Sequence, residues 1–116
     1  LRVMEALMKS YAVAHLRDVD FNEQIADYLR RIDATLEPFG GRFLVHGGRV
    51  HPLEGDFDAT MVMLEFPSLD AARDWYHSPA YQDILPLRTA NSRGIAFLVE
   101  GVEAGYRGVD KLAAQR

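Results

Sequence analysis

The chain contains no cysteine, which excludes disulfides, thiolate zinc sites, iron–sulfur clusters and cysteine nucleophiles. Acidic residues outnumber basic ones, since 17 Asp and Glu against 13 Lys and Arg give a net charge of −4. Nucleic-acid binding and adsorption to acidic membranes both need a basic face, so we expect neither partner. No apolar run approaches the roughly 20 residues of a transmembrane helix. Any chemistry must therefore use histidine, glutamate and arginine.

The beginning of the sequence also lacks a recognisable targeting signal. Residues 1–9 are too short and too charged for the apolar centre of a signal peptide. Together with the absence of cysteine, this favours a cytoplasmic protein. The 116 residues fit one domain, and a composition of 48% hydrophobic and 26% charged residues is typical of a folded globular chain.

Four segments have the alternation and the residue types of β-strands. They are residues 11–17, 42–46, 60–66 and 95–100. Gly47 and Gly48 follow the second strand and indicate a β-bulge or a close backbone approach, with residues 49–51 as a candidate continuation.

Apolar residues at helical spacing predict helices between these strands. The first helix is expected to run from Asp20 to about residue 37, with Asp20 as N-cap and Glu23 completing a capping box. Ser68 is expected to cap a second helix and Ser78 a third. Pro86 should kink or split the third helix.

The order β-α-β-β-α-β predicts an α+β fold of the ferredoxin-like type, with an antiparallel sheet and both helical segments on one face. We expect this domain at residues 11–101, between an N-terminal extension (1–10) and a C-terminal tail (102–116) that is either a partner-binding arm or frayed. Every strand carries apolar residues at both odd and even positions, so both faces of the sheet are apolar. The face that the helices do not cover therefore also needs burial. A homodimer that packs sheet to sheet, enclosing a barrel-like cavity, is the simplest solution.

Two motifs are the most specific features of the sequence: Glu-Phe-Pro-Ser at residues 65–68 and Trp-Tyr-x-Ser-Pro-x-Tyr at residues 75–81. With residues 40–45, 54–55 and 99–101 and Arg88, they resemble the domain of unknown function 1330 family within the dimeric α+β-barrel superfamily. The likeness covers about residues 11–101. It implies a ferredoxin-like protomer that pairs into a dimer, and it implies no established activity.

Three polar strand residues, His15, His46 and Glu65, are candidate catalytic groups. If their parities share the sheet face away from the helices, they converge in an otherwise apolar pocket, as in small-molecule sites. His46 or His15 would then be a general base that Glu65 orients. In the alternative, Glu65 pairs with a neighbouring arginine or a partner-chain donor, and each histidine bonds to backbone.

Arg88, Trp75 and Tyr11 are candidate substrate contacts. Arg88 follows an apolar helix and suits a substrate carboxylate, although a surface or helix-end salt bridge explains it equally well. Trp75 suits stacking on an aromatic ligand, although its helical spacing favours a core position. Tyr11 has the parity of His15 and would face the same pocket. No metal site or cofactor is expected, because the histidines lack metal-binding spacing and no dinucleotide motif is present.

We therefore expect a homodimer that binds a small aromatic or carboxylated metabolite inside its barrel. Related branches of the resembled superfamily are cofactor-independent monooxygenases, cyclases and muconolactone-type isomerases, which implies proton-transfer, oxygenase or isomerase chemistry without a cofactor. The alternative is a non-catalytic dimeric binding or stress-related module. A preformed cavity lined by titratable groups favours the enzyme, and a barrel interior filled by side chains favours the module.

Overall fold

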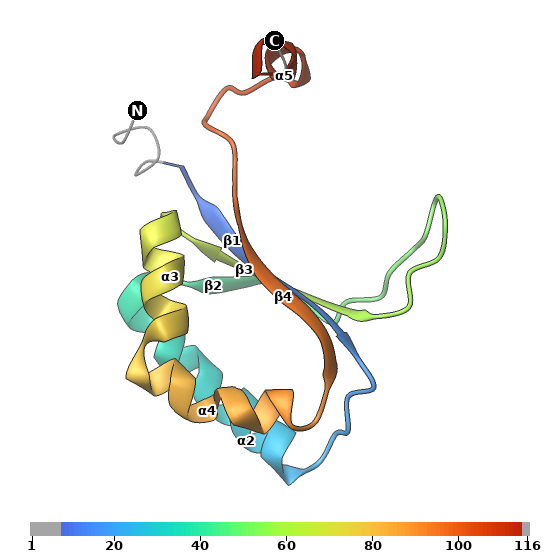
Figure 1. Cartoon of the computed structure of the whole chain (residues 1–116), viewed down its shortest axis with the longest axis vertical. Helices are drawn as coiled ribbons and strands as arrows, with labels where there is room; N and C mark the ends of the chain where they lie inside the picture. Colours follow the sequence, from blue (N-terminus) through green and yellow to red (C-terminus); the bar gives the residue numbers. More distant parts are fainter. Residues whose placement is uncertain (1–7, 115–116) are drawn as a thin grey trace.

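The computed structural model describes residues 8–114, in which four strands form one antiparallel sheet (Figure 1). The strands are β1 (Ser10–Arg17), β2 (Arg42–His46), β3 (Thr60–Phe66) and β4 (Arg93–Glu100). Their order across the sheet is β2-β3-β1-β4, so β1 pairs with both β3 and β4. This arrangement confirms the predicted ferredoxin-like α+β fold. Most of the predicted N-terminal extension lies outside the described residues.

Three helices cover one face of the sheet and leave the other face open (Figure 1). They are α2 (Glu23–Leu36), α3 (Leu69–His77) and α4 (Pro79–Thr89). A single residue, Ser78, joins α3 to α4: its hydroxyl donates to the Trp75 carbonyl (2.7 Å) and accepts from the Tyr81 amide (3.2 Å). α4 continues through Pro86, so of the predicted kink or split at this residue the split does not occur. No helix within residues 8–114 has the length and apolarity to cross a membrane.

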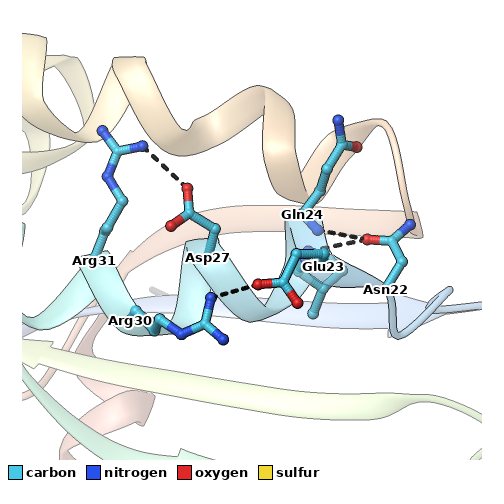
Figure 2. A network of polar contacts seen from close by, with 7 residues as sticks. Asn22, Glu23, Gln24, Asp27, Arg30 and Arg31 are labelled. Atoms are coloured by element: carbon cyan, nitrogen blue, oxygen red, sulfur yellow. Dashed lines mark hydrogen bonds and ion pairs between the residues drawn. The ribbon is translucent and has the colours of Figure 1, made fainter.

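The N-cap of α2 is Asn22 and not the predicted Asp20. The Asn22 side-chain oxygen accepts from the amides of Gln24 (2.9 Å) and Ile25 (3.1 Å), as Figure 2 shows for the first turn. The predicted capping box is also absent, because the Glu23 carboxylate pairs with Arg30 at 2.7 Å (Figure 2).

Asn22→Ala should therefore lower the free energy of unfolding by about 1 kcal/mol, the usual cost of losing an N-cap. Urea denaturation followed by circular dichroism measures this change. Asn22→Ser is the comparison variant: a serine hydroxyl still caps the helix, so it should lose less stability than Asn22→Ala, and what it does lose reports the hydrogen bond from Asn22 to Asn91 (2.6 Å). An equal loss in both variants would contradict the capping role.

The core lies between the helices and the sheet. Phe66 of β3 is fully buried, and Trp75 of α3 and Tyr81 of α4 are almost so. Three short helices complete the described chain: η1 (Glu37–Phe39) follows α2, while η2 (Gly108–Asp110) and α5 (Lys111–Ala114) follow β4. The C-terminal arm after β4 projects away from the domain (Figure 1).

Candidate functional site

A cavity of about 690 Å³ lies between the helices and the sheet. This volume falls within the roughly 300–1,000 Å³ that small-molecule sites occupy. Most of its lining is apolar and comes from β1, α2, β3 and β4. The ionisable side chains in the lining are Tyr28, His46, His77, Tyr76, Tyr81 and Arg88. The cavity of the protomer therefore lies on the helix side of the sheet, whereas the sequence analysis predicted a pocket on the opposite side.

One polar cluster stands out in this apolar lining, where α2 faces α4. The hydroxyls of Tyr28 and Tyr81 lie 2.7 Å apart, and both side chains are buried. Arg88 is seven residues after Tyr81 on α4, which brings the two to the same helix face two turns apart. The Arg88 guanidinium carbon lies 6.0 Å from the centre of the Tyr28 ring, within cation–π range.

The environment keeps this cluster in a definite protonation state. Burial, reinforced by the neighbouring Tyr81, raises the pKa of the Tyr28 hydroxyl well above its usual range, so Tyr28 stays a hydrogen-bond donor at neutral pH. Burial acts to lower the pKa of Arg88, but the hydroxyls of Tyr81 and Tyr28 outweigh it and leave that pKa above its ordinary value. The cavity thus holds one permanent positive charge next to neutral hydroxyls.

Arg88 has no carboxylate within salt-bridge distance in the part of the chain that the structure describes. By contrast, Arg31 pairs with Asp27 and Asp83, and Arg42 pairs with Glu65. Among the described arginines, Arg88 alone is half-buried, and the others are exposed. Exposed arginines are solvated without a partner, whereas a charge withdrawn from water needs one. The Arg88 guanidinium, which lacks a carboxylate partner among the described residues, is therefore the group of this lining best suited to bind an anion.

His46 enters the lining because of a β-bulge. The register between β2 and β3 shifts between Phe43 and Val45, so that Phe43 pairs with Leu64 and His46 with Val62. Both partners lie on the helix side, and the His46 ring stacks on Phe43 with 4.4 Å between ring centres. The sequence placed the irregularity at Gly47 and Gly48; its actual position near residue 44 reverses the face of His46.

Glu65 and Tyr11 lie on the opposite, open face, since they are register partners across β3 and β1. The Glu65 carboxylate accepts from the Arg42 side chain at 2.9 Å and lies 3.5 Å from Lys9. The hydrogen bond from Arg42 holds the pKa of Glu65 below its usual range. Glu65 thus faces away from His46, and the predicted convergence of His15, His46 and Glu65 on one face is wrong.

His15 shares the open face and makes edge contacts with two aromatic rings. Its ring centre lies 5.2 Å from that of Phe57 and 6.3 Å from that of Phe97. The structure therefore separates the six candidate residues into two groups. Arg88, Trp75 and His46 line the cavity, whereas His15, Glu65 and Tyr11 do not.

Trp75 is both a core residue and a cavity-lining residue, the two alternatives that the sequence left open. It is 3% exposed, its indole nitrogen donates to the Thr35 hydroxyl at 3.0 Å, and its ring centre lies 4.1 Å from that of Tyr81, all typical of a core residue. It also contributes to the cavity lining.

Tyr28 and Tyr81 were missed as polar groups, because their helical spacing marked them as members of apolar stripes. Within residues 8–114, no group of three or more His, Asp or Glu side chains is arranged to hold a metal ion.

Solved structures with the same fold include a protein of unknown function from Rhodopseudomonas palustris, with a TM-score of 0.65, 19% identity and 88% coverage of each chain. A dimeric ferredoxin-like protein of unknown function from Jannaschia sp. CCS1 aligns with a TM-score of 0.60 and 14% identity, over 82% of this chain and 99% of that one. SnoaB, a cofactor-independent oxygenase from Streptomyces nogalater, aligns with a TM-score of 0.57 and 14% identity, over 86% and 99% of the two chains.

These likenesses are too distant in sequence to show more than the fold. No functionally curated protein matches the chain in sequence. The model of one family, described as Domain of unknown function (DUF1330), matches residues 9–102 and thus nearly the whole domain. The chain therefore belongs to the DUF1330 family.

Proposed function

We propose that this protein binds a small aromatic or carboxylated metabolite in the cavity between its helices and its sheet, and that Arg88 holds the oxyanion of that ligand. The observation that carries the proposal is the half-buried Arg88 guanidinium, which lines an apolar cavity and has no carboxylate partner within the described chain. A guanidinium binds a carboxylate with two parallel hydrogen bonds, and the low polarity around it strengthens the attraction.

The tyrosine pair supports an oxyanion as the ligand group. Two hydroxyls carry two protons, and the 2.7 Å bond between Tyr28 and Tyr81 uses one of them. Arg88 supplies only donors, so it offers no acceptor for the second proton. A ligand oxygen beside Arg88 would accept that second proton, giving one charge-assisted bond in addition to those from the guanidinium.

The same cluster suits proton-transfer chemistry without a cofactor. When a base removes a proton beside a carbonyl or from a phenol, negative charge develops on oxygen, and preorganised donors stabilise it. Arg88 and the tyrosine pair would supply these donors, and His46 in the cavity lining would be the base. A cavity lined by titratable groups favours an enzyme over a non-catalytic module, and the likeness to a cofactor-independent oxygenase is consistent with this chemistry.

The binding proposal predicts that Arg88→Gln weakens the binding of 2-naphthoate about 10- to 100-fold, because charge-assisted hydrogen bonds contribute roughly 1.5–3 kcal/mol. Trp75 is the sole tryptophan and lines the cavity, so its fluorescence reports occupancy alongside calorimetry. Arg73→Gln on the exposed side of α3 is the matched control and should bind like the wild type.

The neutral analogue 2-naphthalenemethanol separates charge recognition from apolar burial. Wild-type protein should prefer 2-naphthoate, and Arg88→Gln should abolish the preference while leaving the weaker binding of the alcohol unchanged. If the wild type binds both probes equally, or if Arg88→Gln and Arg73→Gln behave alike, Arg88 does not hold a ligand oxyanion.

We also propose that the working unit is a homodimer formed through the open face of the sheet. That face exposes Ile95, Phe97 and Val99 of β4, which are 60%, 43% and 44% accessible. A contiguous apolar patch on a sheet is usually an interface. The protein from Jannaschia, which has the same fold and is described as dimeric, supports a dimer as the working unit. Tyr11, His15 and Glu65 would then lie at or near the dimer contact and not in the ligand site.

A further inference from the structure

Phe21 is an aromatic side chain that the fold itself leaves uncovered. It lies between β1 and α2, contributes to the cavity lining and is nevertheless 75% exposed. Exposed single apolar residues are common, but most of them border no cavity. Leu53 is such a case, since it is 97% exposed in the loop between β2 and β3 and does not line the cavity. Phe21 differs because it is exposed to solvent and also contributes to the cavity lining.

A set of long-range hydrogen bonds fixes the position of the segment that carries Phe21. The Asn22 amide group donates to the Asn91 side-chain oxygen at 2.6 Å, and the Asp20 backbone amide donates to the Asn91 carbonyl at 2.8 Å. The Asn91 side chain donates in turn to Gln24 at 2.7 Å. Figure 2 shows Asn22 and Gln24 at this end of α2.

These bonds also bring Phe21 to the end of the cavity where Arg88 lies. Asn91 is three residues beyond Arg88, and its backbone amide donates to the Arg88 carbonyl at 3.1 Å. Phe21 precedes Asn22, whose side chain holds Asn91. The end of α4 and the start of α2 are thus tied together, with a cation on one segment and an uncovered aromatic ring on the other.

We propose that Phe21 is a specificity-determining ligand contact, and that the ligand is an aryl oxyanion whose ring Phe21 covers while its charge lies at Arg88. This inference rests on the ligand site proposed above and narrows its substrate class to compounds with the anionic group attached to, or close to, an aromatic ring. Ring-on-ring contact removes the exposed face of Phe21 from water and adds the preferred geometry of aromatic pairs. A non-aromatic carboxylate would gain the ionic contact without the stacking.

The experiment compares 2-naphthoate with cyclohexanecarboxylate by calorimetry on the full chain. Phe21→Ala should weaken 2-naphthoate about 5- to 10-fold and cyclohexanecarboxylate less than twofold, and Phe21→Trp should restore 2-naphthoate binding. The midpoint of thermal unfolding should stay unchanged, because Phe21 contributes little buried area. Leu53→Ala is the matched control and should bind both probes like the wild type.

Arg88→Gln separates this inference from the proposal on which it depends. If Arg88→Gln loses 2-naphthoate binding while Phe21→Ala does not, the ligand site stands and the role of Phe21 is overturned. If Phe21→Ala weakens both carboxylates equally, Phe21 shapes the site without selecting aromatic ligands, which also overturns the inference. If neither variant changes binding, the proposed site itself fails.

Discussion

Phe97→Asp is expected to convert the proposed dimer into monomers at micromolar concentration. Phe97 lies on β4 opposite Val13 of β1, and Val13 in turn lies opposite Met63 of β3. This row crosses the middle of the open face, where Val13 is only 5% exposed because its neighbours already cover it. A carboxylate placed in this row would lose its water in a sheet-to-sheet contact and would find no cation opposite Phe97 in the row itself.

The expected effect is large, because burying an unpaired charge costs several kcal/mol. We expect the dimer dissociation constant to rise more than 100-fold, which sedimentation equilibrium or light scattering measures over a concentration series. Ala80→Asp, which adds the same charge at an exposed position of α4, is the control and should leave the dimer intact. A wild-type monomer at these concentrations, or dissociation by both variants, would contradict the proposed interface.

A second interface variant tests how far the ligand site depends on dimerisation. Phe97 is among the residues that line the cavity, so this test uses Val99→Asp, because Val99 pairs with Tyr11 of the open face and does not line the cavity. If the cavity belongs to the protomer alone, monomeric Val99→Asp should still bind 2-naphthoate with an affinity close to that of the wild type. The separation of the two faces is the reason for this expectation.

The fold was predictable because its signals are local. The third predicted strand coincides with β3, and the second coincides with β2, since alternating apolar residues bounded by proline, glycine or charged turns define strand ends within a few residues. The break between α3 and α4 was equally visible, because Ser78 followed by Pro79 marks a helix start. The N-cap of α2 was not, since the bond that favours Asn22 comes from Asn91, 69 residues away.

The site was predictable only in part, because it depends on register and on empty space. A bulge of one residue near Leu44 sends His46 to the helix side and leaves Glu65 on the other, and nothing in the residue types around it fixes its position. A cavity is a place that side chains do not fill, so no sequence pattern marks it. Arg88 was identified by its chemistry, whereas Tyr28 and Tyr81 were hidden by an apolar spacing that suits aromatic core residues equally well.

Gly94→Ala is expected to be among the most destabilising single substitutions in the chain. Gly94 is the second residue of β4 and pairs with Leu16 of β1, with a φ of +134° that L side chains rarely adopt. A Cβ atom there would collide with the carbonyl oxygen of His15, and backbone in a sheet has little freedom to move aside. To remove this clash, β4 would have to shift relative to β1, and the shift would break the hydrogen bonds between the two strands.

We expect a loss of about 3 kcal/mol or more in the free energy of unfolding, measured by urea denaturation, because backbone strain and steric overlap add. Gly105→Ala is a discriminating control, since Gly105 has a φ of +81° but no atom close to the added methyl group. Its expected cost is about 1 kcal/mol from the positive φ alone. Equal costs at the two positions would mean that dihedral strain, and not the close approach of β1, explains the glycine at residue 94. A larger cost at Gly94 would instead show that the spacing between β1 and β4, on which both the cavity wall and the open face depend, tolerates no side chain at this point.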